Sequence, residues 1–148
     1  MGYEGIGLFL DADMLMRGDV AELFSLKDET AVQVVKNKQR FEWGSMMLFD
    51  NAKCKVLTPG YIDDKTTNPL ALKWANPIGD LPPEWNHCVG YDQPNSNAKL
   101  VHYTKGVPCW PETKGCEHSD AWWEEFRKTN STVSHQELMG RSIHVAGA

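Results

Sequence analysis

An apolar strand that ends in two aspartates constrains this chain more than any other feature. Residues 6–10, Ile-Gly-Leu-Phe-Leu, form a continuous apolar run, which is typical of a strand buried on both faces in an α/β sheet. Asp11 and Asp13 follow directly. Ligands bind at the carboxyl ends of strands in open α/β sheets, and the alternation of side chains aims both aspartates to one side. We therefore expect a polar site at the end of this strand.

The rest of the pattern predicts one small α/β domain, because 148 residues suffice for a single buried core. We expect the core to cover about 5–129, with 130–148 as a tail or arm. The chain passes through a region rich in proline, glycine, asparagine and aspartate at 58–87, which is typical of loop. Further strands are expected at 31–35, 45–50 and 99–104.

Two helices are expected, one at each end of the domain. The first covers 18–27, with Asp19 as N-cap and Glu22 in a capping-box relation. The second covers 120–129, with Ser119 as N-cap. Segment 52–57 fits either a continuation of the preceding strand or a helix start, and 68–75 fits a short helix.

Charge and composition exclude several classes of protein. The net charge is −5 and the longest basic cluster is the short segment 36–40, which argues against nucleic acid as a partner. No apolar run reaches the roughly 20 residues of a membrane span, and the N-terminus lacks the basic region of a signal peptide. Four scattered cysteines indicate free thiols in a reducing compartment, so we expect a cytoplasmic protein; pairing of Cys109 with Cys116 is the alternative.

The two aspartates have the spacing of a divalent-cation site. Mg²⁺ or Mn²⁺ takes one or two protein carboxylates and completes its shell with phosphate oxygens and water. The alternative is that Asp11 and Asp13 only end a strand and cap a turn. His102, in the strand expected at 99–104, is a candidate third ligand that suits Mn²⁺; the alternative is a histidine at a strand end whose nitrogens are used within the protein. It is followed by Lys105, which can neutralise phosphate charge, and by Gly106, which lets a ligand approach the backbone.

Three segments resemble one enzyme family in type and in order. They are LFLDADMLMRGDVAELF at 8–24, FEWGSMMLF at 41–49 and LVHYTKGVPCW at 100–110. They are similar to the metal-binding segment, the small-residue turn with its strand, and the late histidine segment of glycogenin-like glycosyltransferases of the GT-A fold. The resemblance covers about residues 5–126.

The resemblance implies a truncated or miniature GT-A-like mixed sheet flanked by helices. It implies transfer of a sugar from a nucleotide-sugar donor, such as a UDP-sugar, with Mn²⁺ or Mg²⁺ stabilising the departing diphosphate. By this likeness the metal ligands are Asp11, Asp13 and His102. The donor ribose and diphosphate lie near Ala12, Lys105 and Gly106.

The resemblance also implies where sugars bind. Glu42, Trp43, Gly44 and Ser45 would lie near the donor sugar or the acceptor. Glu84, Asn86 and His87 belong to a loop like the one that covers the acceptor in that family. Trp43, Trp85 and Trp110 are candidates to stack on sugar rings, whereas Trp122 and Trp123 are expected in the core.

No catalytic base can be named from the sequence. Asp63 and Asp64 are the paired carboxylates of the middle region. They either act near the anomeric carbon or cap a turn, and we favour the turn.

The sequence departs from the family in three places. The small-residue turn reads Glu-Trp-Gly-Ser at 42–45, and Pro108 and Cys109 stand where the family has Lys-Pro. Only residues 1–10 precede Asp11, where the family has a nucleotide-binding half. We therefore expect an exposed sheet edge. Either a second copy of the chain covers it, or the chain is a miniature enzyme, an inactive remnant or a piece of a longer protein.

Two other functions fit the strand with its aspartates. In haloacid-dehalogenase-like phosphatases the first aspartate is a nucleophile and the second a general acid. That pattern wants threonine or valine where Leu15 stands, and its late acidic loop is poorly matched by 78–80. The non-enzymatic alternative is a nucleotide-binding, carbohydrate-binding or assembly remnant.

Overall fold

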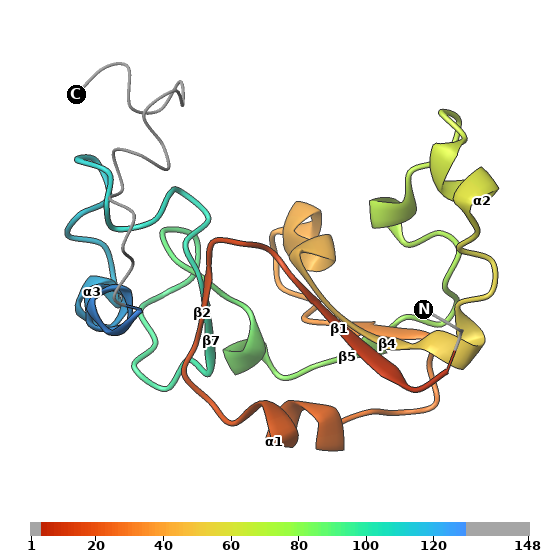
Figure 1. The fold of residues 1–148 in the computed structure, drawn as a ribbon, viewed down its shortest axis with the longest axis horizontal. Coiled ribbons are helices and arrows are strands. Elements are labelled where there is room, and N and C mark those ends of the chain that lie inside the picture. Colours follow the sequence, from red (N-terminus) through yellow and green to blue (C-terminus); the bar gives the residue numbers. More distant parts are fainter. Residues whose placement is uncertain (1–3, 130–148) are drawn as a thin grey trace.

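Two small mixed sheets with short helices around them make up the fold (Figure 1). The computed structural model describes residues 4–129. In the first sheet β1 (Ile6–Leu10) is antiparallel to β4 (Met46–Asp50), and β4 is antiparallel to β3 (Val32–Val34). Strand β3 is parallel to β5 (Gly79–Asp80). The strands of this sheet, in spatial order, are β1, β4, β3 and β5.

The second sheet is smaller and contains the strand that ends in His102. Its central strand is antiparallel to one neighbour and parallel to the other. The spatial order is β2 (Met14–Met16), β7 (Leu100–His102) and β6 (His87–Cys88). The α/β class with mixed sheets, predicted from the sequence, is confirmed, and so are the strands expected at 6–10, 31–35, 45–50 and 99–104.

Short helical segments connect these strands. For segment 52–57 the sequence left a strand extension or a helix start open, and the structure has the 3₁₀ turn η2 (Asn51–Lys53) there. Where a helix was expected at 68–75, the structure has the shorter 3₁₀ turn η3 (Pro69–Ala71). The α-helices are α1 (Val20–Ser25), α2 (Pro59–Asp63) and α3 (Ser119–Lys128). The 3₁₀ segments are η1 (Arg40–Ser45), η2 (Asn51–Lys53), η3 (Pro69–Ala71) and η4 (Pro83–Trp85).

The two predicted helix starts have different outcomes. Asp19 caps α1, since its carboxylate accepts the Ala21 N–H at 2.8 Å. Glu22 reaches Lys99 Nζ at 2.8 Å, an ion pair to the chain segment before β7. The helix expected at 120–129 is present as Ser119–Lys128, but the N-cap predicted at Ser119 was wrong: the N-cap is His118, which adopts a left-handed conformation with φ 60°.

The largest core cluster lies where the two sheets meet. The chain crosses from one sheet to the other at 11–13 and again at 81–86. Trp85 in the second crossing is 1% exposed, so its proposed role in stacking on a sugar is excluded. The cluster joins α1, the end of β3, β4, β7 and the crossing at 81–86 through Leu23, Val35, Met46, Leu48, Leu81, Trp85 and Leu100.

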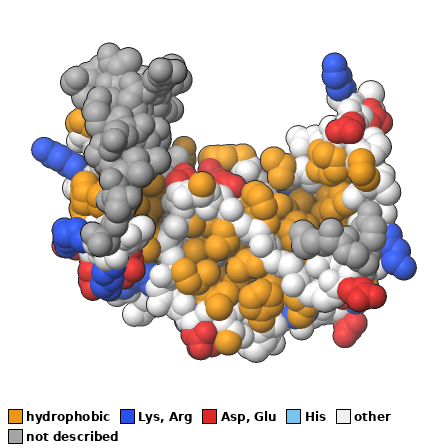
Figure 2. Space-filling model, viewed as in Figure 1, with side chains coloured by type: hydrophobic (Ala, Val, Ile, Leu, Met, Phe, Trp, Pro, Cys, Tyr) orange, Lys and Arg blue, Asp and Glu red, His pale blue; other side chains and the backbone are white. Residues whose placement is uncertain are grey.

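Strand β1 lies at the outer edge of its sheet. Within residues 4–129 it pairs with β4 on one side and with no strand on the other. Ile6 and Phe9 are 43% and 42% exposed, so the expectation of a strand buried on both faces was wrong. Figure 2, which views the molecule from the same side as Figure 1, shows hydrophobic side chains gathered over the middle of the molecular face turned to the reader. The exposed edge expected from the sequence is therefore present in the part of the chain that the structure describes.

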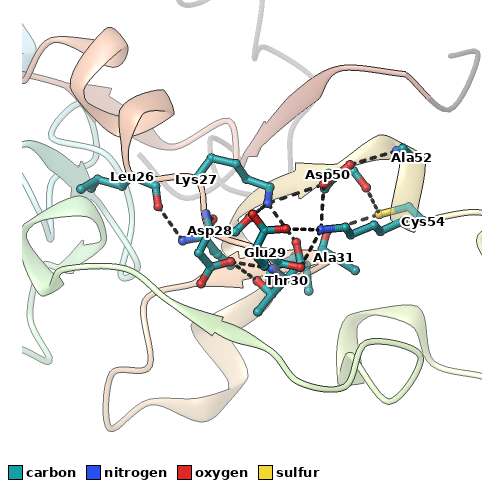
Figure 3. Close-up of polar contacts among 12 residues, drawn as sticks. Leu26, Lys27, Asp28, Glu29, Thr30, Ala31, Asp50, Ala52 and Cys54 are labelled. Atoms are coloured by element: carbon teal, nitrogen blue, oxygen red, sulfur yellow. Dashed lines mark hydrogen bonds and ion pairs between the residues drawn. The ribbon is translucent and has the colours of Figure 1, made fainter.

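Charged contacts hold the loop between α1 and β3 against the end of β4 (Figure 3). Lys27 Nζ lies 3.7 Å from Asp50 Oδ2 and donates to the Thr30 carbonyl at 3.1 Å. Lys53 Nζ lies 3.4 Å from the same Asp50 oxygen and 3.2 Å from Glu29. Exposed ion pairs contribute little individually, but together these contacts set the path of the loop into β3.

The structure bears on two expectations from the sequence, the absence of a membrane span and the state of the cysteines. No helix within residues 4–129 is long and apolar enough to cross a membrane. The cysteines form no disulfide in the described part of the chain, so the alternative pairing of Cys109 with Cys116 is not found.

Gly79 in β5 provides a test of this packing. A Cβ at this position would overlap with the side chains of Gln33 and Thr30. Gln33 cannot easily move, because its amide accepts the Asp28 N–H and donates to the Leu26 carbonyl. We expect Gly79→Ala to lower the free energy of unfolding by about 1–3 kcal/mol, measured by urea denaturation.

Gly115→Ala is the matched control. A Cβ at Gly115 would have no neighbour within 4 Å. Its unfolding free energy should remain within about 0.5 kcal/mol of the parent chain. Equal destabilisation by the two substitutions would contradict the packing described for β5.

Candidate metal centre

The turn at 11–13 carries the chain from β1 into β2 and is held at both ends. The Asp11 N–H donates to the Ser45 carbonyl at 2.9 Å, which ties the turn to the start of β4. The Tyr103 N–H donates to the Asp13 carbonyl at 3.0 Å, which ties it to the end of β7. Backbone hydrogen bonds from both sheets therefore position the two carboxylates.

Sheet register brings His102 to these carboxylates. Met14 pairs with His102 between β2 and β7, so the imidazole lies beside the residue that precedes Met14. His102 Nε2 lies 3.3 Å from Asp13 Oδ1 and 4.0 Å from Asp11 Oδ2. One ligand atom from each of the three residues lies within 4.8 Å of the others. His102 is 3% exposed, while both carboxylates are about 40% exposed and face solvent.

Glu42 occupies the other side of the same imidazole. Its Oε2 lies 3.6 Å from His102 Nδ1, a buried atom that has no hydrogen-bond partner among the described residues. A carboxylate beside the second ring nitrogen is the usual partner of a metal-binding histidine, because it sets the ring orientation and tautomer. The resemblance implied that Glu42 contacts a sugar, but the structure places it behind His102.

Buried hydrogen bonds hold η1, and with it Glu42, in place. Asn86 Nδ2 donates to Ser45 Oγ at 3.0 Å and to the Glu42 carbonyl at 3.3 Å, and Ser45 Oγ donates to the same carbonyl at 2.6 Å. Asn86 and Ser45 are 1% and 4% exposed. The expectation that these two residues contact substrate is therefore wrong, because their polar groups are used inside the protein.

The carboxylates of the cluster carry an excess of negative charge. Burial raises the pKa of Asp11; His102 opposes this shift and the Asp13 carboxylate adds to it. Burial also raises the pKa of Glu42, which His102 opposes and the two aspartates reinforce. Three carboxylates around one imidazole therefore form an environment that a cation stabilises.

This donor set suits Mn²⁺ better than Mg²⁺. Two exposed carboxylates supply the oxygen ligands that Mg²⁺ and Mn²⁺ both accept. One buried imidazole with a carboxylate behind it favours Mn²⁺, because imidazole is a poorer ligand for Mg²⁺. Asp11, Asp13 and His102 would hold the ion, with the remaining positions open to solvent or to a ligand.

A cleft of about 620 Å³ opens beside Asp13. Lys105 lines it, and the Lys105 ammonium lies 4.8 Å from the centre of the Tyr91 ring. Trp110 lines the same cleft, so one of the proposed aromatic contacts does lie beside the cluster. Among the described residues, the lining consists of Asp13, Lys105, Gly106, Val107, Trp110, Glu112 and Thr113.

Gly106 lines the cleft without a side chain, and its backbone N–H is already used in a hydrogen bond within the protein. Its N–H donates to the Tyr103 carbonyl at 2.7 Å, so it is not available to a phosphate as the sequence suggested. Its φ of 115° favours glycine, and a Cβ would lie 3.1 Å from Trp110 Cδ1.

The other residues expected to contact ligand are divided between surface and interior. Ala12 is exposed on the turn between the aspartates, as a contact to the ribose requires. Trp43 is half-buried and donates from Nε1 to the Asn37 carbonyl at 3.0 Å. Gly44 is buried against Leu70.

Glu84 and His87 also differ in their positions. Glu84 is half-exposed, and its carbonyl accepts the Lys99 N–H at 2.8 Å. His87 is 3% exposed and lies 2.9 Å from Glu117, so it faces the interior rather than an acceptor. The sequence offered one signal for this contact, the adjacent Glu117 and His118, which we had not singled out.

Asp63 and Asp64 lie far from the cluster. They belong to α2 and its C-cap, at the opposite end of the molecule from β2 and β7 (Figure 1). Asp64 Oδ1 accepts the Thr66 N–H and the Thr66 hydroxyl, both at 2.8 Å. This carboxylate caps a turn, which is the alternative that the sequence favoured.

The fold and the site define a small α/β protein with a carboxylate–histidine cluster at the junction of two mixed sheets. No protein-family model matches the sequence, and no solved structure is significantly similar to it. The chain is similar to Protein CDI of Arabidopsis thaliana, with 30% identity over 158 aligned residues. The similarity covers 86% of this chain, which spans 60% of the length of that relative.

The raised pKa of Glu42 predicts a pH-dependent effect of Glu42→Gln on the metal-depleted protein. Folding raises the pKa of the Glu42 carboxyl above its ordinary value of 4.5. Such a group stabilises the fold at pH values below its ordinary pKa, and this contribution is lost as the pH rises through its pKa in the folded protein. We therefore expect Glu42→Gln to gain stability relative to the parent chain between pH 4 and pH 7. Urea unfolding at several pH values measures this difference.

Glu112→Gln is the control, because this exposed carboxylate lies outside the cluster. Its effect on the unfolding free energy, measured at the same pH values, separates the loss of a surface carboxylate from the loss of Glu42. A pH-independent effect of Glu42→Gln would show that Glu42 does not share the charge of the cluster.

Proposed function

We propose that this chain is a metal-dependent glycosyltransferase domain that binds a nucleotide-sugar donor, such as a UDP-sugar. The observation that carries the proposal is the convergence of Asp11, Asp13 and His102 beside a cleft lined by Lys105. These are the residues to which the sequence resemblance assigned the metal and the donor diphosphate. Neither the relative nor any other comparison bears on this activity.

The chain's own charges explain how a diphosphate could bind to an acidic protein. Asp11, Asp13 and Glu42 would repel phosphates, and Lys105 is the cation that lines the cleft. A bound Mn²⁺ would act as a Lewis acid that stabilises the charge formed on the departing diphosphate. His102 would offer its Nε2 to the ion, and the Glu42 carboxylate, 3.6 Å from Nδ1, would orient the ring once it accepts the Nδ1 proton.

The remaining cleft residues suit the rest of the donor. The Lys105 side chain is exposed and packs against Tyr91, which orients the ammonium without burying it. Trp110 presents an aromatic surface in the same cleft, and ligand sites commonly combine such a surface with a few polar groups. We propose that the diphosphate lies between Asp13 and Lys105 and that a sugar ring contacts Trp110.

Variants of the cluster test this proposal directly. We expect Asp13→Asn and His102→Gln each to weaken Mn²⁺-dependent binding of UDP at least about tenfold, measured by calorimetric titration. Asp63→Asn is the matched control, because this exposed carboxylate lies at the other end of the molecule, and it should bind like the parent chain. UDP binding that is unchanged in either cluster variant would contradict the assignment of the ligands.

Turnover separates the enzyme from its alternatives. Release of UDP from a UDP-sugar that requires Mn²⁺ and is lost in Asp13→Asn supports a transferase. Metal-dependent binding without turnover of any nucleotide sugar would favour a binding or assembly role. Phosphatase activity that is lost in Asp11→Asn would favour the phosphatase alternative.

Two further predictions concern the setting of the protein. A second copy of the chain would cover the open edge of β1, which sedimentation at increasing concentration tests through self-association. A cytoplasmic location, predicted from the cysteines, is tested by fractionation of cells that express a tagged chain.

A further inference from the structure

A second group of possible metal ligands lies in the described part of the chain, outside the cluster at 11–13. His87 comes from β6, whereas Glu117 and His118 directly precede α3. One ligand atom of each residue lies within 4.8 Å of the others. His87 is 3% exposed, His118 10% and Glu117 24%. The group is thus more deeply buried than Asp11 and Asp13, and no role assigned above uses it.

The polar atoms of this group converge on one carboxylate. His87 Nε2 lies 2.9 Å from Glu117 Oε2, and His118 Nε2 lies 3.2 Å from Glu117 Oε1. The backbone carbonyl of Asn95 lies 3.0 Å from His118 Nε2, and the Asn95 N–H donates to Glu117 Oε1 at 2.7 Å. Two imidazole nitrogens, a carboxylate and a carbonyl oxygen therefore surround one small volume.

We propose that His87, Glu117 and His118 form a second metal site, distinct from the cluster at 11–13 and suited to Zn²⁺. Two imidazoles with one carboxylate are a typical zinc donor set, and the Asn95 carbonyl or a water molecule would complete four-coordination. Neighbouring ligands of a tetrahedral zinc ion lie roughly 3.3–3.6 Å apart. His87 Nε2 lies 2.9 Å from Glu117 Oε2 and His118 Nε2 lies 3.2 Å from Glu117 Oε1, and one ligand atom of each residue lies within 4.8 Å of the others, so small side-chain movements would bring the three ligands around one ion.

The surroundings of His87 are arranged for the change of tautomer that a metal requires. An ion at Nε2 displaces the proton from that nitrogen, and a neutral imidazole then carries its proton on Nδ1. Asp92 Oδ2 lies 4.0 Å from His87 Nδ1 and is itself fixed by the Cys88 N–H at 2.8 Å. This carboxylate lies on the Nδ1 side of the ring, where carboxylates behind zinc-binding histidines accept that proton, and it would have to approach by about 1 Å to do so.

The charge states of the ligands also suit a metal. Burial lowers the pKa of His118, which favours the neutral imidazole. Burial alone would raise the pKa of Glu117, but hydrogen bonds from His87 and Asn95 outweigh it and leave the pKa below its usual value. A neutral imidazole and an ionised carboxylate are the forms that bind a cation.

The site would fasten α3 to the second sheet. Within α3 no residue is fully buried, and Trp122 is its main contact with the core cluster beneath. Trp122 stacks on Phe126, and Trp123 contacts both rings edge to face. The expectation that Trp122 and Trp123 are core residues is therefore only partly met, because both remain half-exposed. A metal held by His87 and by the two residues before α3 would add a cross-link at the start of the helix.

The conformation of His118 provides a variant that removes the imidazole without disturbing the backbone. His118 has φ 60°, and asparagine tolerates this left-handed region well. We therefore choose His118→Asn and the isosteric Glu117→Gln. Both are made in a His102→Gln background, which removes the first centre. Glu124→Gln is the matched control, because Glu124 pairs with Lys128 on the exposed face of α3.

The experiment measures zinc bound to the whole chain after removal of metals with a chelator. Each protein is dialysed against micromolar Zn²⁺ and its metal content is measured by mass spectrometry. We expect about one zinc per chain in His102→Gln and in its Glu124→Gln derivative, and at least about a tenfold loss in the Glu117→Gln and His118→Asn derivatives. Circular dichroism establishes that each variant is folded.

A spectroscopic measurement keeps the test independent of folding defects. Co²⁺ in the His102→Gln chain should show the visible absorption of a tetrahedral site, and the ring nitrogens of His87 and His118 should shift in nitrogen-15 NMR spectra when Zn²⁺ is added. Zinc should also raise the melting temperature of this chain, because it binds the folded state. The proposal is overturned if the His102→Gln chain retains no zinc, or if the Glu117 and His118 variants retain as much as the Glu124 control.

Discussion

The rest of the site depends on one three-residue turn that belongs to both sheets. At 11–13 the backbone leaves β1, donates a hydrogen bond to the Ser45 carbonyl, accepts one from the Tyr103 N–H, and enters β2. These bonds fix the aspartates relative to β4 on one side and β7 on the other. Because β7 ends in His102, the pairing of β2 with β7 brings the imidazole to the carboxylates without any loop having to close over them. Sites held by paired strands are more precise than sites on loops.

Charge gives this geometry its chemical character. A buried imidazole stands between Glu42 on one side and two aspartates on the other, and burial together with mutual repulsion raises the pKa of Asp11 and Glu42. Such an arrangement costs stability unless a cation compensates it, which is the physical basis for proposing a divalent ion there. Around His87 the balance differs, because two imidazoles share one carboxylate and the negative charge is smaller. The proposed preference for Mn²⁺ in one site and Zn²⁺ in the other follows from these donor sets.

Much of this could be predicted locally. The strand at 6–10, the strand that ends at His102 and the Asp19 cap of α1 all arise from neighbouring residues, and the structure contains each of them. The strands β5 and β6 have two residues each and β2 has three, which is too short to show a periodic pattern. Without β2 in view, the position of His102 beside Asp13 rested on the resemblance and on the general tendency of ligands to bind at strand ends. Trp85, Ser45 and Asn86 were expected at a ligand because of the resemblance, and their residue types could not correct this, because tryptophan, hydroxyl and amide groups serve equally well in a core or in a binding site.

The sequence by itself determined the local elements and the residue types that can hold a cation, since a polar pair directly after a short apolar run is typical of the end of a buried strand. Only the tertiary structure decided which of those residues meet. In the fold, Glu42 faces His102, and the buried side chains of Asn86 and Ser45 hold η1 in place. Asp63 and Asp64 lie at the far end of the molecule. His87 contacts Glu117, thirty positions further along the chain. These outcomes depend on how two small sheets share one core at the crossings 11–13 and 81–86, and contacts between distant segments leave no periodic signal in either segment alone.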